Sequence, residues 1–140
     1  MIEVGFWGRA FSTDRGDVNA VALSGPSGLQ SRLWDILVVT APLPAGVGCA
    51  CRTLLMASHL SGEDLGQVSA ERVISLGFSP RDSLTLTAME EQPVICLQRE
   101  ILTVNGQRVE PQEFPLPAEK HREEAEKLLF ETGLQLLLDR

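Results

Sequence analysis

Two cysteines separated by one residue are the first groups in this sequence that could do chemistry. Cys49 and Cys51 stand in the segment PLPAGVGCACR, while Cys96 and His59 lie elsewhere in the chain. Thiolates and imidazoles are natural zinc ligands, and a complete set would form a tetrahedral site. The spacing is poor for zinc, because structural sites usually separate paired cysteines by more residues. We therefore interpret the thiols as small residues of the core or of a loop, with a redox or metal-binding role as the alternative.

A glycine-containing turn near the N-terminus is the second candidate. The segment GFWGRAFST (residues 5–13) follows a short strand expected over Ile2–Trp7. A phosphate-binding loop occupies this place in nucleotide-binding α/β folds, but it needs a lysine and a hydroxyl directly after its last glycine. Here Gly8 is followed by Arg9, so we interpret the segment as a tight turn.

Polar residues on two neighbouring stretches form the third candidate. The stretches QRE (98–100) and EPQE (110–113) flank the pair Asn105-Gly106. An Asn-Gly pair between β-like runs predicts a hairpin, which would bring the two stretches together on adjacent strands. We expect there either a concave polar surface or a solvated rim of cross-strand pairs.

Continuous apolar runs predict the strands that must position these groups. The runs are WDILVVTA (34–41), RTLLMAS (52–58) and RVISLG (72–77), and a helical turn or two is expected over 62–68. Unbroken apolarity is typical of parallel strands that helices cover on both faces. Shorter runs at 83–89, 94–97 and 101–104 predict an antiparallel part of the sheet. From Ala118 the pattern becomes helical, with Ala125, Leu128 and Leu129 on one apolar face.

Composition limits the class of protein. The chain has 140 residues, of which 44% are hydrophobic and 22% charged, as in a folded domain. Its net charge of −7, without a cluster of basic residues, argues against nucleic acid and membrane surfaces as partners. No secretory pattern or membrane-spanning run is present, and three cysteines argue against a disulfide framework. We therefore expect a soluble cytoplasmic protein.

The order of the expected elements carries a family resemblance. The segments concerned are WDILVVT (34–40), TLLMASHLSGED (53–64), RVISLGFS (72–79) with Asp82, the hairpin at Asn105-Gly106 and the helix after Leu116-Pro117. Over about two-thirds of the chain this order resembles the later part of the central domain of the Mur ligases, which add amino acids to peptidoglycan precursors using ATP.

The departures from that family bear on activity. The Gly-rich GKT loop is absent, ASH (57–59) replaces an Asn-Asp-Asp segment, and the His-Asn signature before the last helix is not reproduced. The resemblance therefore implies a degenerate scaffold that has lost the ligase chemistry, and no ATP site is carried over.

These observations combine into one expected fold and one expected function. The fold is a single α/β domain over residues 1–140, Rossmann-like with three layers, parallel core strands, an antiparallel C-terminal hairpin and a C-terminal helix. The function is non-catalytic binding or regulation, and the partner is a small molecule or a protein. We expect no cofactor and no metal. A small redox or metal-binding enzyme using the Cys49/Cys51 loop is the alternative.

The ligand site is expected at the C-terminal ends of the strands, around the loop 42–52, as is usual for open α/β sheets. Assembly with a second copy through the leucine-rich tail 134–138 is a further alternative. The candidate ligand-binding residues are Thr40, Cys49, Cys51, Arg52, Gln98 and Arg99.

Overall fold

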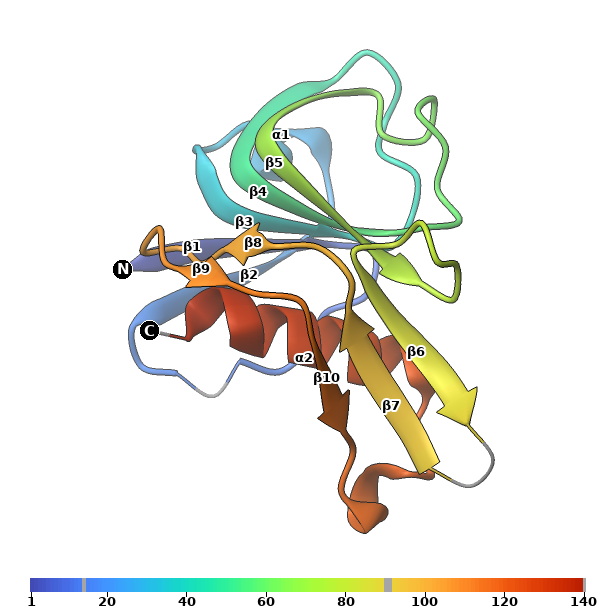
Figure 1. Cartoon of the computed structure of the whole chain (residues 1–140). Coiled ribbons are helices and arrows are strands. Elements are labelled where there is room, and N and C mark those ends of the chain that lie inside the picture. Colours follow the sequence, from blue (N-terminus) through green and yellow to red (C-terminus); the bar gives the residue numbers. More distant parts are fainter. Residues whose placement is uncertain (14, 90–91, 140) are drawn as a thin grey trace. The chain divides into compact units, whose positions relative to one another are not determined.

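The structure is a computed structural model of the chain, and it describes residues 1–13, 15–89 and 92–139 (Figure 1). Strands make up 42% of the residues and helices 16%, and the strands have a β-solenoid-like stacked arrangement. The expected Rossmann-like three-layer α/β domain is therefore wrong. A mostly-β fold with few helices also conflicts with the expected Mur-ligase-like scaffold.

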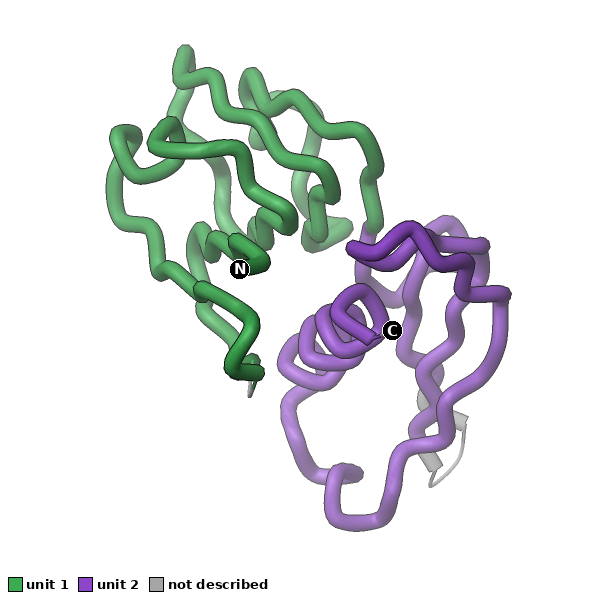
Figure 2. Tube along the Cα trace, turned by 90° about the vertical axis from the view of Figure 1, so that its left-hand side faces the viewer, with its two compact units in different colours: residues 1–74 green, residues 75–140 purple. Residues whose placement is uncertain are grey.

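The chain divides into two compact units, Met1–Ile74 and Ser75–Arg140, which Figure 2 shows in green and purple. In unit 1 the strands follow the order β5-β4-β3-β1-β2. Strand β1 pairs in parallel with β2 and with β3, and β3 pairs in parallel with β4. The elements of unit 1 are β1 (Ile2–Trp7), β2 (Val18–Leu23), α1 (Pro26–Leu29), β3 (Trp34–Val39), β4 (Gly48–Ala57) and most of β5 (Gln67–Gly77).

Short connections explain why no helix lies between β3 and β4 or between β4 and β5. Only residues 40–47 join β3 to β4, and only residues 58–66 join β4 to β5. A helical crossover between parallel strands usually needs about a dozen residues or more. The first connection also contains Pro42 and Pro44, which oppose helix formation. The helical turns expected over 62–68 are accordingly wrong, because this segment forms turns and then the start of β5.

Single apolar residues in the connections between the strands of unit 1 are buried. Phe11, Leu29, Leu43 and Leu60 each lie outside the strands and are all buried. The backbone N–H of Leu43 donates to the carbonyl of Asp64 over 2.7 Å, which ties the two connections together. Each of these connections therefore contributes one buried apolar side chain, and the strands supply most of the core of this unit.

Unit 2 contains the antiparallel strands and the main helix. The last residues of β5 pair in parallel with β6, and β6-β7-β10 continue as antiparallel neighbours. Helix α2 packs against β6 and buries Leu128 and Leu129, as its apolar pattern predicts. Gly133 lies inside this helix. The elements are β6 (Leu84–Met89), β7 (Gln92–Leu97), β8 (Ile101–Leu102), β9 (Arg108–Val109), β10 (Gln112–Pro115), the 3₁₀ turn η1 (Ala118–Lys120) and α2 (Ala125–Leu138).

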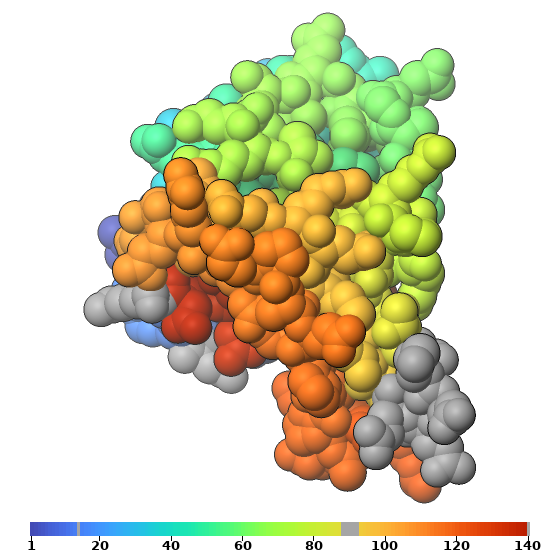
Figure 3. All heavy atoms as spheres, viewed as in Figure 1, coloured from blue at the N-terminus to red at the C-terminus, as the bar shows by residue number. Residues whose placement is uncertain are grey.

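The expected hairpin is present, with a different turn. Strands β8 and β9 pair antiparallel, and the N–H of Gly106 donates to the carbonyl of Thr103 over 2.9 Å. Val104 and Asn105 are thus the central residues of the turn, and Gly106 follows them with φ of 78°. Glycine adopts this left-handed conformation without a steric penalty. In the space-filling view of Figure 3 the orange residues of β9 and β10 lie at the surface, in agreement with their exposure.

Candidate functional site

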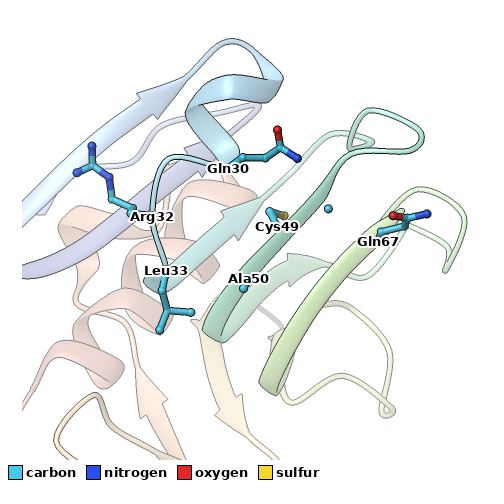
Figure 4. Close-up of a pocket in the computed structure, with 7 residues that line it drawn as sticks. Gln30, Arg32, Leu33, Cys49, Ala50 and Gln67 are labelled. Carbon is cyan, nitrogen blue, oxygen red and sulfur yellow. The ribbon is translucent and has the colours of Figure 1, made fainter.

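A shallow depression in unit 1, lined by described residues, is the candidate site (Figure 4). It lies where β4 and β5 begin and where the chain leaves α1 toward β3, and its volume is about 570 Å³. This volume is in the range of small-molecule pockets. The depression is lined by Gln30, Arg32, Leu33, Gly48, Cys49, Ala50 and Gln67.

Local backbone features place the lining residues. Gln30 ends the short helix α1, and its N–H donates to the carbonyl of Pro26 over 3.1 Å. Gly66 has φ of 57° and turns the chain into β5, which begins at Gln67. Gly48 begins β4 without a side chain, so the space between the two strand starts stays open. The depression is therefore formed at element ends and not within an element.

Two amide side chains are the main polar groups of the depression. Gln30 and Gln67 are exposed, and among the described residues neither side chain has a hydrogen-bond partner. Figure 4 shows them on either side of the start of β4. Leu33 adds an apolar surface, because 49% of it is exposed. An amide both donates and accepts hydrogen bonds, so the pair can present complementary groups to a neutral polar molecule.

Arg32 lines the depression, but its charge is already engaged. Its guanidinium donates to the carboxylate of Glu3 over 3.0 Å and lies 5.1 Å from the centre of the Trp34 ring. Figure 4 shows the side chain extending away from the other labelled residues. The depression therefore offers mainly neutral groups to a ligand.

The thiols of Cys49 and Cys51 are poorly suited to chemistry. Both are buried, with Cys51 only 2% exposed. Burial raises the pKa of Cys49, and it raises the pKa of Cys51 to about 12, with smaller contributions from Cys49 and Glu71. Because the thiolate is the nucleophile and the metal ligand, this environment disfavours both roles. The two residues are also alternate positions of one strand, about 6.6 Å apart, at the upper end of the disulfide range.

A row of polar contacts crosses the sheet of unit 1 near the starts of its strands. Its first part joins β2 to β1, since the amide of Asn19 donates to the carboxylate of Glu3 over 2.8 Å. The N–H of Glu3 donates to the carboxylate of Asp35 over 2.7 Å, which continues the row to β3. The hydrogen bonds that the Glu3 carboxylate accepts, first from Asn19 and then from Arg32, lower the pKa of Glu3.

Arg52 completes this row and is one of the predicted site residues. Its guanidinium lies 3.5 Å from the carboxylate of Asp35 and 3.6 Å from that of Glu71. It therefore bridges β3, β4 and β5, with its charge balanced by two acids. The contacts give Arg52 a positioning role across the sheet, and it does not line the depression.

Thr40 lies far from the other predicted residues of unit 1, which all belong to β4. Cys51 pairs with Trp34, the first residue of β3, whereas Thr40 follows the last residue of that strand. Six strand positions separate these levels, which corresponds to about 20 Å. The expected loop over 42–52 is also shorter than predicted, because β4 already begins at Gly48. Of the predicted residues only Cys49 lines the depression.

Gln98 and Arg99 belong to unit 2 and contact the backbone of a turn. The Gln98 amide donates to the carbonyl of Asp82 over 2.9 Å, and the Arg99 guanidinium donates to the carbonyl of Arg81. The same turn is closed by the Asp82 carboxylate, which accepts the N–H of Ser79 over 3.0 Å. Both predicted residues thus hold the turn that leads from β5 into β6.

Sequence reasoning missed Gln30, Leu33 and Gln67. None of them belongs to a motif, and each lies at the boundary of an element. The usable signals were local: Gln67 follows Gly66, and Gln30 follows the cluster Gly25–Gly28, which marks a turn. Neither signal indicates that the segment at Gln30 and the segment at Gln67 lie close together in space.

Within residues 1–13, 15–89 and 92–139, no group of three or more His, Cys, Asp and Glu side chains is arranged to hold a metal ion. In the same residues no helix combines the length and apolarity that crossing a membrane requires. Comparisons with protein-family models, with curated proteins and with solved structures give no match.

Proposed function

We propose that the chain is a non-catalytic binding domain whose unit 1 holds a small neutral molecule in the depression beside Gln30 and Gln67. The ligand class combines an amide-like edge, which donates and accepts hydrogen bonds, with an apolar ring or branched group. The observation that carries the proposal is the pair of glutamine amides without partners among the described residues, facing one depression from two separate segments.

The lining supports a neutral ligand over a charged one. Arg32 is balanced by Glu3, and the net charge of −7 disfavours anions over the whole surface. Leu33 and Ala50 supply apolar groups to the lining, which suits a ring or a branched alkyl group. The amide edge then orients the ligand through hydrogen bonds, and the apolar part contributes affinity.

The buried thiols favour binding over catalysis at this site. Cys49 lines the depression and is a reactive residue type, but burial raises its pKa and disfavours the thiolate. A redox or metal-binding enzyme at this loop therefore has less support than a binding site.

Titration with benzamide tests the proposal, because this molecule joins a primary amide to an apolar ring. Two-dimensional ¹H–¹⁵N NMR should show saturable shifts of the side-chain NH₂ groups of Gln30 and Gln67 and of the Gly48 amide. A dissociation constant in the millimolar range is expected, since small ligands gain about 0.3 kcal/mol or somewhat more per heavy atom. Methyl benzoate, which lacks the N–H donors, should bind at least about fivefold more weakly.

Substitutions localise the binding. Gln67→Leu removes one amide with little change in size and should weaken benzamide binding by about fivefold or more. Gln135→Ala removes an exposed glutamine of α2 that does not line the depression and should leave the affinity unchanged. Equal affinities of wild type and Gln67→Leu, or shifts confined to other residues, would contradict the proposal.

A further inference from the structure

Strand β2 ends the sheet of unit 1 and has one free edge. In the order β5-β4-β3-β1-β2 its only strand neighbour among the described residues is β1, and all six of its residues pair with that strand. Alternate residues of a strand direct their N–H and C=O groups to opposite sides. Half of the residues of β2 therefore direct these groups outward, away from β1.

The outward backbone groups have no partner among the described residues. Beyond the ladder with β1, the only backbone hydrogen bond of β2 is from the N–H of Val18 to the carbonyl of Arg15, over 3.3 Å. The side-chain amide of Asn19 donates to Glu3 of β1, and no other hydrogen bond of this strand is present among the described residues. Such a row of donors and acceptors is a template for another strand.

The sequence of β2 carries none of the usual protections of an edge strand. Its residues VNAVAL contain no charge and no proline, and the pairing with β1 is continuous without a bulge. Ala20 and Ala22 are exposed. Natural proteins usually protect a free edge with lysine, proline, a bulge or a short strand.

Strand β10, the terminal strand of unit 2, shows such protection. It spans only Gln112–Pro115, it contains a carboxylate at Glu113, and it ends in a proline that cannot donate to a ladder. The same chain thus protects one terminal strand and leaves the other open for pairing.

We propose that β2 pairs with β2 of a second copy of this chain, antiparallel and across a twofold axis, and that this continues the sheet of unit 1 from one copy into the other. A twofold axis makes the two edges identical, so each donates and accepts the same hydrogen bonds. An identical strand can therefore satisfy the outward groups of both copies at once.

The register of this pair follows from the backbone pattern. In an antiparallel pair, two opposite residues direct their N–H and C=O groups either both toward each other or both away from each other. Neighbouring residues of one strand direct these groups to opposite sides, so they cannot face each other across the axis. One residue must therefore lie on the axis and face its own copy. Ala20 and Val21 are the central choices. With Ala20 on the axis, Asp17 of one copy faces Leu23 of the other, and with Val21 on the axis it faces Gly25. In neither register do like charges face each other, which favours self-pairing.

The tail expected to mediate assembly is not free to do so. Leu134, Leu137 and Leu138 of the segment 134–138 are buried in the chain. Assembly through β2 needs no rearrangement of that helix, because it uses an edge that is already open.

Light scattering coupled to size-exclusion chromatography tests the proposal with the full chain. At about 300 µM the mass should approach twice the 15.3 kDa of one chain, and at about 10 µM it should fall toward one chain, as for a small interface. A single-chain mass at the higher concentration would overturn the proposal.

A double substitution identifies the edge. Ala20→Lys with Ala22→Lys places lysine opposite lysine in both registers and should shift the dissociation constant at least about tenfold toward monomer. The change also reduces the net charge of −7, so general charge repulsion would act in the opposite direction. Ser27→Lys with Ser69→Lys adds the same charge at exposed positions outside β2 and should leave the dimer intact.

Hydrogen exchange keeps the test valid if the lysine variant folds poorly. In the wild type, the outward amides of β2 should exchange more slowly at about 300 µM than at about 10 µM, with the other strands unchanged. A dimer that the lysine pair does not weaken, or β2 amides that exchange at the same rate at both concentrations, would overturn the pairing.

Discussion

Gly8 and Thr40 lie against each other where β1 and β3 end, and the contact leaves no room for a side chain at Gly8. A Cβ atom there would collide with Oγ1 of Thr40, and Gly8 has φ of 96°. The same Oγ1 accepts the N–H of Arg9 over 2.7 Å. Thr40, expected to bind a ligand, therefore has a structural role in the turn after β1.

Substitution of Gly8 tests this contact. Gly8→Ala should lower the free energy of unfolding of unit 1 by about 2–4 kcal/mol, through the left-handed backbone and the collision with Thr40. Urea unfolding followed by tryptophan fluorescence measures this, because both tryptophans, Trp7 and Trp34, belong to unit 1. Gly62→Ala is the matched control, since a Cβ there meets no atom within 4 Å, and its effect should stay within about 0.5 kcal/mol. Equal effects of the two variants would contradict the account.

The acid stability of unit 1 should depend on Glu3. Hydrogen bonds from Asn19 and Arg32 lower the pKa of Glu3 from its ordinary value of 4.5, so the folded state favours the charged carboxylate. This contribution is complete above pH 4.5 and is lost as the pH falls through the lower folded-state pKa. Midpoints of urea unfolding between pH 6 and pH 3 should therefore fall less steeply for Glu3→Gln than for wild type. Glu63→Gln, at an exposed loop position, should follow the wild-type slope.

The alkaline stability of unit 1 should depend on Cys51. Its pKa of about 12 in the folded state exceeds the value of 9.0 expected without burial. An unfolded chain loses the proton first, so this contribution is complete below pH 9 and is lost as the pH rises from 9 toward 12. Urea midpoints should fall across this range, and Cys51→Ala should reduce the slope. Native Cys51 should also react with a thiol reagent at least about 100-fold more slowly than in urea, and a fast native reaction would contradict its burial.

The turn before β6 should depend on Asp82 and Gln98. Asp82 is 3% exposed, and its carboxylate accepts the N–H of Ser79. The side-chain amide of Gln98 donates to the backbone carbonyl of Asp82. Asp82→Ala should lower the free energy of unfolding of unit 2 by about 1–3 kcal/mol, and Gln98→Ala by about 1 kcal/mol. Circular dichroism at 222 nm follows this unit through α2. Gln107→Ala, at an exposed hairpin position, is the control and should change little. Equal losses of unfolding free energy in Asp82→Ala and in this control would contradict the role of the Asp82 carboxylate in the turn.

Several elements were predictable because their signals are local. The apolar run from Trp34 forms β3 over Trp34–Val39, and Leu128 and Leu129 lie on the buried face of α2. The Asn-Gly pair predicts the β8–β9 hairpin, although Gly106 follows the turn centre. Periodicity and turn chemistry depend on neighbours within a few residues, so they can be read without a fold.

The layers and the site were not predictable in this way. An apolar run indicates that a strand is buried, but it does not indicate which elements cover the strand. Here single loop residues such as Leu43 and Leu60 take the place of helices. The expectation of a single domain over 1–140 stays a prediction beside the division into two compact units. The proposed ligand and the second copy are likewise predictions for experiment.

By itself, then, the sequence determined the strand that begins at Trp34, the hairpin at Asn105-Gly106 and the apolar face of the last helix, because each is set by contacts close along the chain. The tertiary structure alone decided which residues meet. The parallel register of Trp34 with Cys51 places Thr40 about 20 Å from the thiols. The same packing sets Gln30 and Gln67 around one depression, although 36 residues lie between them in the chain. Strand partners and register depend on long-range packing, which no local pattern encodes.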